Sequence, residues 1–478
     1  MFEFKILAKS ISSKARVGEF STPHGKLITP NLAFVATEGE IKSITKEVLP
    51  TLPVNLIIVN TFHLWVKNVI QTIDDGRSKV DDEDRSSKIE NNQSSILNPQ
   101  DLSSTLYPLL SSFSVHDYVN FDKPIMSDSG GFQVFSMGFG KAHGVGKITN
   151  IFPQLNVGYP ERAKRVEGSH YDQGNPLIIN ENGVEFPFND QKLMLTPEKS
   201  IQLQQQIGAD IIFAFDECTS PLNSYEYTKE AMERTHRWLK RCIKTSQINQ
   251  KRSEVGKIRN QNNSDKSDIS DLSDLSGIRL PISSDLSGLS ERRKQALFGI
   301  IQGGHYEDLR KKSAKFVGKQ DVPGFGIGGS LGRNKKDMHQ VLEWVIPLLP
   351  DEKPRHLLGI GQVRDIFECV ERGVDTFDCV IPTREARHQI LYTKHGRVNL
   401  KKMKNVNEAI EIDCNCLACQ SNVTMKQLSS LFLLKDPRAY YFSTIHNIQF
   451  FTDLMKNIRE AIEIKKLSKL KEIYFKFY

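Results

Sequence analysis

The sequence lacks the apolar segments that would carry a chain into or across a membrane. No apolar run approaches the roughly 18 residues that a membrane-spanning helix needs. The first ten residues, MFEFKILAKS, carry an acid within their apolar stretch and have no hydrophobic core of a secretory signal peptide. We therefore expect a cytoplasmic protein without a membrane partner.

Cysteine is also scarce, and no charge of one sign dominates. Seven cysteines in 478 residues argue against a disulfide framework, and three of them lie together at the C-terminal end. The 64 Lys and Arg against 57 Asp and Glu give a net charge of +7, a mild excess that is compatible with a nucleic-acid partner. The length permits several average domains or one barrel with insertions.

Short apolar runs that end abruptly on polar or glycine residues recur along the chain. Each has the near-continuous pattern of a strand buried on both faces. The eight runs span residues 31–37, 55–63, 124–132, 210–218, 297–304, 323–330, 355–362 and 375–383. Amphipathic segments of helical length lie between many of them, such as the one that opens with Thr196 as N-cap and Pro197. The alternation predicts an α/β fold, a parallel (β/α)8 TIM barrel with insertions.

The barrel is expected to occupy residues 1–400, with a zinc-binding subdomain of residues 401–478 packed on it. Three stretches do not fit the alternation and are interpreted as insertions, near 72–100, 138–192 and 246–295. The last contains SDKSDISDLSDLSG, which is too polar to bury a face, so we expect a mobile loop between a helix and a strand.

A cluster of cysteines near the C-terminal end predicts a metal site. Cys414, Cys416 and Cys419 supply three thiolates within six residues, and His446 follows on an expected helix. These four can form a tetrahedral Cys3His zinc site, and four protein ligands leave no position for water, which indicates a structural zinc, one per chain. The plainer alternative is a set of reduced core cysteines beside an unrelated histidine.

Three acids close apolar runs: Asp128, Asp216 and Asp378. An Asp in such a place often only caps a helix. In a (β/α)8 barrel, however, the carboxyl ends of the strands meet at the active face, so the three side chains should converge. Nearby glycine pairs would let backbone approach a ligand closely; they are Gly130 and Gly131, Gly303 and Gly304, and Gly328 and Gly329.

The motifs around these acids resemble those of the tRNA-guanine transglycosylases, in the same order and over nearly the whole chain outside the insertions. They are SDSGGFQVFS (127–136), FAFDECTSP (213–221), FGIIQGGHYEDLR (298–310), GIGG (326–329), LLGIG (357–361), FDCVIPTREAR (377–387) and CNCLACQ (414–420). FDECTSP looks like the bacterial form. The resemblance implies a zinc-containing barrel enzyme, without a redox or nucleotide cofactor, that works as a homodimer.

The reaction that the resemblance implies is an exchange at the wobble position of tRNAs with GUN anticodons, those for Asp, Asn, His and Tyr. Guanine in the anticodon loop is replaced by a 7-deazaguanine base, queuine or its aminomethyl precursor preQ1, in queuosine modification. Asp378 would be the nucleophile that attacks C1′ of the ribose, and Asp128 the proton-transfer residue. A carboxylate suits an oxocarbenium-like centre, as in retaining glycosidases.

The remaining site residues follow from the same resemblance. Asp216 would accept hydrogen bonds from the base edge, Gln302 and the Gly329 amide would address the base carbonyl, and Phe132 and Leu358 would sandwich the ring. The loop of Ser129, Gly130 and Gly131 completes the base site. RNA contacts are expected from Gly359, Ile360, Gly361, Gln362, Val363, Arg364, Asp365, Thr383, Arg384, Glu385, Ala386 and Arg387.

Several positions depart from the family pattern. Ser330 stands where the family usually has leucine, and His388–Gln389 where it has Asn–Gly. Gly332 leaves room for the ring of queuine, whereas Cys218 looks like the precursor-using form; steric room favours queuine slightly. Alternative readings are a non-catalytic tRNA-binding partner subunit, an archaeosine-type enzyme acting in the D-arm, and a barrel hydrolase with catalytic zinc.

Overall fold

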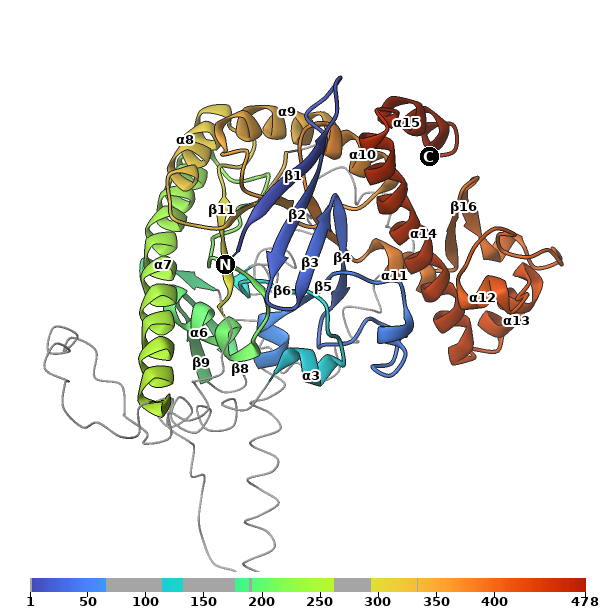
Figure 1. The fold of residues 1–478 in the computed structure, drawn as a ribbon, viewed down its shortest axis with the longest axis horizontal. Helices are drawn as coiled ribbons and strands as arrows, with labels where there is room; N and C mark the ends of the chain where they lie inside the picture. The colour runs from blue at the N-terminus through green and yellow to red at the C-terminus, as the bar shows by residue number, and fades with distance from the viewer. Residues whose placement is uncertain (1, 66–113, 132–176, 189–190, 262–293, 333) are drawn as a thin grey trace, which may run out of the picture.

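Eight parallel strands close into a barrel in the computed structural model, which describes residues 2–65, 114–131, 177–188, 191–261, 294–332 and 334–478 (Figure 1). The predicted (β/α)8 fold is confirmed, and each predicted apolar run overlaps one barrel strand. In chain order the strands are β4 (Asn31–Ala36), β5 (Ile57–Val59), β6 (Ile125–Ser127), β10 (Ile211–Phe213), β11 (Ala296–Ile301), β12 (Gly324–Ile327), β13 (Arg355–Leu357) and β14 (Thr376–Cys379). β14 pairs with β4 and closes the barrel.

Both faces of these strands are buried because successive side chains point alternately into the barrel and toward the helices. Met126, Phe213 and Phe298 belong to the core inside the barrel. Phe34 and Phe377 belong to the larger core between the barrel and its outer elements. This explains why the runs are continuously apolar rather than alternating.

Helices follow most of the strands and cover the outside of the barrel. They are α3 (Val115–Val119), α6 (Pro197–Ile207), α7 (Tyr225–Gln261), α8 (Glu307–Gly318), α9 (Lys335–Val345), α10 (Val363–Glu371) and α11 (Ile381–Arg387), with short 3-10 turns η1 (Leu49–Thr51) and η8 (Ile346–Leu348). α6 begins as predicted: the Thr196 hydroxyl accepts the N–H of Lys199, and Pro197 follows. Gly208, with φ of +81°, ends this helix in the left-handed conformation.

An antiparallel sheet precedes the barrel, and the sequence did not predict it. It consists of β1 (Phe4–Lys9), β2 (Arg16–Thr22) and β3 (Gly25–Thr29), drawn in blue in Figure 1. Phe4, Phe20 and Leu27 of this sheet join the core inside the barrel. A buried ion pair fastens it, since the Arg16 guanidinium donates 2.7 and 2.8 Å bonds to Asp375, the residue before β14. The sheet therefore closes the amino end of the barrel.

The C-terminal part contains a hairpin and a set of helices. Its elements are β15 (Ile390–Thr393), β16 (Gly396–Asn399), the turn η9 (Leu400–Lys402), α12 (Leu417–Gln420), α13 (Met425–Leu433), α14 (Pro437–Glu463) and α15 (Leu467–Phe475). The long helix α14 connects the cysteine cluster to the barrel, where the Arg459 guanidinium donates to the Pro30 carbonyl at 2.8 Å (Figure 1).

The three expected insertions are only partly described. The stretch 72–100 lies outside the described residues, as do residues 138–176 of the second. The rest of the second forms most of a small antiparallel sheet, β7 (Ile178–Ile179), β8 (Val184–Phe188) and β9 (Gln191–Leu195). The third begins as a continuation of α7 to Gln261, and its low-complexity part lies outside the described residues.

Candidate active site and metal centre

The predicted acids stand at the carboxyl ends of three barrel strands, and all are half-buried. Asp128 follows β6 directly, Asp216 comes three residues after β10, and Asp378 is the third residue of β14. The same end carries Gln302 after β11, Gly329 after β12 and Leu358 after β13. All six belong to the active face of a barrel of this kind.

Hydrogen bonds join the ends of three neighbouring strands around Asp216. The Ser129 hydroxyl donates to its Oδ1 at 3.2 Å, and the Gln302 amide donates to its Oδ2 at 2.6 Å. The Gly131 N–H in turn donates to the Ser129 hydroxyl at 3.2 Å. Asp216 is thus held as an acceptor at the centre of this group, and the N–H groups of a base edge could bind the same oxygens.

Gln302 and Gly329 lie in close contact. A Cβ at Gly329 would lie 2.0 Å from Gln302 Oε1, and its φ is +73°, so only glycine fits here. The buried Gln302 Oε1 has no hydrogen-bond partner among the described residues. A buried acceptor without a partner is costly, and a ligand that donates to it would remove that cost.

Two residues that the sequence analysis missed hold Asp128. The Asn60 amide donates to Oδ2 at 2.7 Å, and the Thr61 N–H donates to Oδ1 at 3.0 Å. The Gly130 N–H donates to the same Oδ1 at 3.2 Å. Asn60 and Thr61 lie near the end of the second predicted run (55–63), so their position directly after β5 was the available signal. Three donors fix the orientation of this carboxylate and favour its ionised form.

The Asp378 carboxylate lies at the barrel mouth with 17% of its side chain exposed. The Gly359 N–H donates to its Oδ1 at 2.8 Å, and His356 Nε2 lies 3.1 Å from the same atom. Leu358 lies between them in sequence, against the Gly328 backbone, where an added Cβ would approach its side chain to 3.0 Å. Phe132, the other expected partner of the base ring, lies outside the described residues.

Arg310 of α8 is a further residue that the analysis did not single out, although it ends the QGGHYEDLR motif. Its side chain is fully buried and donates to four backbone carbonyls, those of Ile301, Gly304, Gly328 and Ser330, at 2.7–3.0 Å. Burial lowers the pKa of Arg310 to about 9, so the guanidinium stays charged at neutral pH. It ties together the two loops that carry Gln302 and Gly329.

The expected RNA-binding residues divide into surface and buried positions. Gly359 and Arg364 are exposed, and Gln362, Arg384, Glu385 and Arg387 are half-buried, whereas Ile360, Gly361, Val363, Asp365, Thr383 and Ala386 are buried. Arg384 and Arg387 lie in the last turn of α11, which begins three residues after Asp378.

Several members of this set have protein partners, among them Asp365 and Arg364. The Asp365 carboxylate pairs with Lys335 Nζ at 2.8 Å, and burial nevertheless raises the pKa of Asp365. The Arg364 guanidinium donates to the carbonyls of Phe475, at 2.9 Å, and Tyr478. Lys335, at the start of α9, therefore holds the buried Asp365 carboxylate.

The cysteine cluster has the dimensions of a tetrahedral metal site. His446 Nδ1 lies 3.7, 3.6 and 3.5 Å from the sulfurs of Cys414, Cys416 and Cys419, and all four residues are buried. For Zn–S and Zn–N bonds of ordinary length, the N-to-S edge of a tetrahedron is about 3.5 Å. The four predicted ligands are thus brought together at a spacing that fits a zinc ion.

The environment of the cluster supports a cation as well. His446 Nε2 lies 2.8 Å from the Tyr392 carbonyl, which fixes Nε2 as the N–H and leaves the Nδ1 lone pair toward the thiols. Hydrogen bonds with Cys414 and Cys419 lower the pKa of Cys416 to about 4. Shared hydrogen bonds and burial raise the pKa of Cys419. A divalent cation would offset the negative charge that accumulates when all three thiols ionise.

A second cluster of possible ligands lies at the opposite end of the barrel. Asp210 precedes β10; its Oδ1 lies 2.8 Å from His24 Nδ1 and its Oδ2 3.3 Å from His116 Nε2. The N–H of Ile125 donates to Oδ2 at 3.0 Å. Burial opposes ionisation, but these hydrogen bonds outweigh it and lower the pKa of Asp210. We interpret this carboxylate as a clamp between the β2–β3 turn, α3 and β6.

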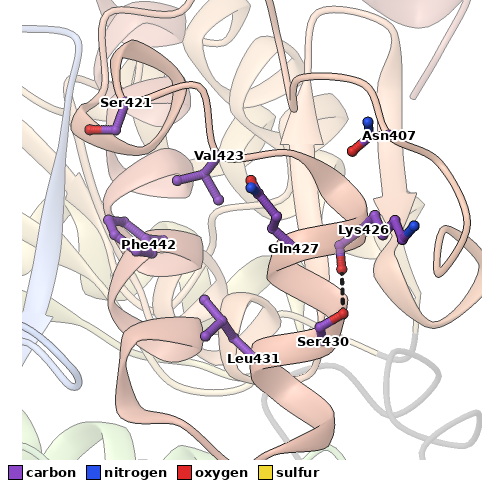
Figure 2. Close-up of a pocket in the computed structure, with 8 residues that line it drawn as sticks. All are labelled: Asn407, Ser421, Val423, Lys426, Gln427, Ser430, Leu431 and Phe442. Atoms are coloured by element: carbon purple, nitrogen blue, oxygen red, sulfur yellow. Dashed lines mark hydrogen bonds between the residues drawn. The ribbon is translucent and has the colours of Figure 1, made fainter.

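A pocket of about 600 Å³ lies in the C-terminal part, between α13 and α14 (Figure 2). Asp128, Asp216 and Asp378 are not among the residues that line it. Figure 2 shows Leu431 and Phe442 on facing helices. The Ser430 hydroxyl donates to the Lys426 carbonyl at 2.9 Å. No Asp, Glu, His or Cys lines it. It therefore has no chemistry of its own for an exchange reaction.

A closed barrel whose mouth carries acids and glycine-rich loops is the architecture of an enzyme, here one with a candidate metal site. The family profile described as queuine tRNA-ribosyltransferase matches residues 10–84, 169–274 and 279–478. A relative in Archaeoglobus fulgidus is 36% identical over 487 residues, with 99% of each chain covered.

Bacterial relatives align over almost the same length. The queuine tRNA-ribosyltransferase of Halothermothrix orenii is 31% identical over 99% of this chain and 97% of its own, and that of Staphylococcus aureus is 33% identical over 98% and 94%. The chain belongs to the queuine tRNA-ribosyltransferase family, and it is a pentosyltransferase that acts on tRNA and a base. Among the described residues no helix is both long and apolar enough to span a bilayer.

Proposed function

We propose that this enzyme replaces the wobble guanine of GUN-anticodon tRNAs by a 7-deazaguanine base through a covalent ribosyl-aspartate at Asp378. The observation that carries the proposal is the placement of that carboxylate: partly exposed at the barrel mouth, held by two groups at one oxygen, and followed at once by the arginine-bearing helix α11. An anion so placed can meet the positive charge that develops at C1′.

In the first half of the reaction a carboxylate oxygen of Asp378 bonds to C1′ while the bond from C1′ to N9 of guanine breaks. The electron pair of that bond passes to the base, which takes a proton from Asp128. In the second half the incoming base loses a proton to Asp128 and attacks C1′, and the ester bond to Asp378 breaks. Asp128 thus ends with the proton it began with.

Base recognition is assigned to the group around Asp216. Its carboxylate accepts N–H donors of the base edge, and Gln302 with the Gly329 amide addresses the base carbonyl. Gln302 Oε1 is buried and accepts no hydrogen bond among the described residues, which supports a ligand-binding site here. A donor group of the ligand would supply the missing hydrogen bond. Leu358 and Phe132 are proposed to lie against the two faces of the ring, and Ser129, Gly130 and Gly131 complete the wall.

We propose queuine or preQ1 as the incoming base. Gly332, which favours queuine by its size, also has a structural reason to be glycine: its φ is +103°, and a Cβ would lie 2.2 Å from Asp337. Cys218 is buried. Competition between the two bases for exchange of labelled guanine distinguishes them, and a lower inhibition constant for queuine is expected if the space at Gly332 is used.

The tRNA side of the site is assigned to the exposed and half-buried residues of the two RNA segments. Arg384 and Arg387 would hold phosphates around the flipped nucleotide, and Gly359 with Gln362 would contact the backbone. The buried members of both segments would shape these loops. The metal at Cys414, Cys416, Cys419 and His446 is proposed to be a structural zinc, which supplies no chemistry and holds the segment of Cys414 to α12 against α14.

We further propose the division into a barrel of residues 1–400 and a zinc subdomain of 401–478, and a homodimer in the cytoplasm, where tRNA is modified. Exposed Leu433 and Leu434, at the end of α13, offer apolar surface for association. Light scattering should give twice the chain mass, and Leu433→Glu should shift it toward one chain; a wild-type mass of one chain would contradict the dimer.

The direct test is guanine exchange into an anticodon stem-loop RNA with a GUN anticodon. Wild-type protein should incorporate labelled guanine and give an RNA–protein adduct on denaturing gels, and Asp378→Ala should give neither. Asp453→Asn, a half-buried acid on α14, is the matched control and should keep both. Exchange by Asp378→Ala at the wild-type rate would refute the nucleophile, and label confined to the D-arm of full-length tRNA would refute the wobble position.

A further inference from the structure

His356 is a histidine that no motif singled out, and it lies beneath the proposed nucleophile. It is the middle residue of β13 and is completely buried. Its Cα is paired with that of Thr376 on β14, and Thr376 and Asp378, two residues apart, point to the same face of that strand. Inside the barrel its ring lies 5.2 Å from that of Phe213, so it belongs to the interior wall below the mouth.

The two ring nitrogens of His356 have different partners. Nδ1 lies 2.9 Å from the Thr376 hydroxyl, and Nε2 lies 3.1 Å from Asp378 Oδ1. An ionised carboxylate can only accept, so Nε2 must carry a proton in order to contact it favourably. In the neutral ring Nδ1 is then a lone pair and accepts the hydroxyl proton of Thr376. The Thr376 hydroxyl thus donates to His356, and His356 in turn donates to Asp378.

The Gly359 N–H donates to the same Oδ1, so two N–H groups converge on one oxygen of the nucleophile. Hydrogen bonds to an anionic oxygen are roughly twice as strong as those to a neutral one. Both donors therefore favour the free carboxylate of Asp378 over the neutral ester that it forms with ribose.

We propose that His356 is a positioning residue that makes the Asp378 carboxylate a good leaving group when the incoming base attacks the covalent intermediate. The inference rests on the proposed function, because it takes Asp378 as the nucleophile. In that second step the bond from C1′ to the Asp378 oxygen breaks, and the electron pair returns to the carboxylate as the base N9 bonds to C1′. The hydrogen bond from Nε2–H to Asp378 Oδ1 strengthens as negative charge returns to the carboxylate. It therefore stabilises the transition state of this step more than it stabilises the ester.

This role predicts an outcome that loss of packing alone would not produce. Removing the donor should slow breakdown of the ester more than its formation, so the adduct should accumulate. A residue that only packs the barrel would, when changed, reduce adduct formation and RNA binding together.

The experiment uses a labelled anticodon stem-loop RNA with guanine at the wobble position, chased with excess guanine after adduct formation. The test pair is His356→Gln, whose amide N–H can take the place of Nε2–H, and His356→Asn, whose shorter amide cannot reach Asp378. His356→Asn should slow decay of the adduct roughly tenfold to hundredfold, as expected for a lost hydrogen bond to a charge, and leave KM for RNA within about twofold. His356→Gln should decay at close to the wild-type rate.

Equal decay rates for His356→Asn, His356→Gln and wild type would overturn the inference, as would a loss of adduct in His356→Asn with a matching rise of KM. The two variants have similar size and polarity, so both could share a folding defect. Thr376→Val is therefore the third variant to be measured. That variant removes the hydroxyl that fixes the tautomer and should slow decay in the same direction but less. Absence of an adduct in wild-type protein would refute the proposed function itself, which separates the two failures.

Discussion

Replacing Arg310 by methionine should loosen both base-recognition loops at once. The guanidinium is the common donor to carbonyls on either side of Gln302, those of Ile301 and Gly304, and on either side of Gly329, those of Gly328 and Ser330. Methionine has a similar length but no donor. The change therefore leaves the packing of α8 nearly intact and removes the link between the loops.

The magnitude follows from the fate of the four carbonyls. That of Ile301 keeps a partner, since it also accepts the Gly328 N–H at 3.2 Å. The other three lose the guanidinium, and a buried acceptor left without a partner costs about 1–3 kcal/mol. Part of this is recovered because the charge no longer has to be buried. We expect a loss of about 3–5 kcal/mol in the free energy of unfolding, at the upper end for a single substitution.

The assay combines urea unfolding with guanine exchange. Arg310→Met should lower the unfolding midpoint and raise KM for the base at least tenfold, with a smaller change in KM for RNA. Lys311→Met, the neighbouring exposed residue on the same helix, is the control and should change stability by less than about 0.5 kcal/mol. A variant that keeps both the midpoint and the base KM of the wild type would refute the reasoning.

Three further predictions follow from buried groups. Burial lowers the pKa of His236 to about 4, whereas the ordinary pKa is near 6.5. The free energy of unfolding should therefore be highest above pH 6.5 and fall by about 3 kcal/mol as the pH falls toward 4. His236→Gln should flatten the plot of urea midpoint against pH in that range, and parallel plots for variant and wild type would contradict this. Asp375→Ala strands the buried Arg16 and should cost about 3–5 kcal/mol in thermal unfolding. Glu3→Ala, which breaks an exposed ion pair with Lys5 beside the sheet that carries Arg16, should cost about 1 kcal/mol or less. Elemental analysis should find one zinc per wild-type chain, none in Cys419→Ser and one in Cys369→Ser, a buried cysteine outside the cluster; equal zinc in both variants would argue against the site.

The barrel was predictable because burial on both faces gives strands a continuous apolar signature, and all eight were found. The Cys3His cluster was predictable because three of its ligands are close in sequence. The sheet β1–β3 was missed because it lies before the first barrel strand and its strands mix exposed with buried positions. The role of this sheet is apparent only from the structure, where Phe4, Phe20 and Leu27 join the core inside the barrel. These residues lie outside the alternation of strands and helices that predicts the barrel.

The acids of the site were predictable because each ends an apolar run, but several of the groups that hold them were not. Asn60 and His356 act through partners 68 and 22 residues away in the chain. Arg310 makes its four bonds to backbone carbonyls, which every residue possesses, so no side-chain pattern marks it. These contacts join residues that are far apart in the chain. They depend on how the strands and helices pack in the closed barrel, so they can be identified only in the three-dimensional structure.

The seam at which the barrel closes sets an order for biosynthesis. β4 pairs with β14, with Ala33 opposite Asp378, so the two edges of the seam are about 345 residues apart in the chain. A ribosome must deliver about four-fifths of the polypeptide before that pairing can form, and contacts so distant in sequence slow folding. Until then the edge of β4 is an unprotected strand that can pair with another nascent chain. Production at low temperature or with chaperones should accordingly raise the yield of active enzyme.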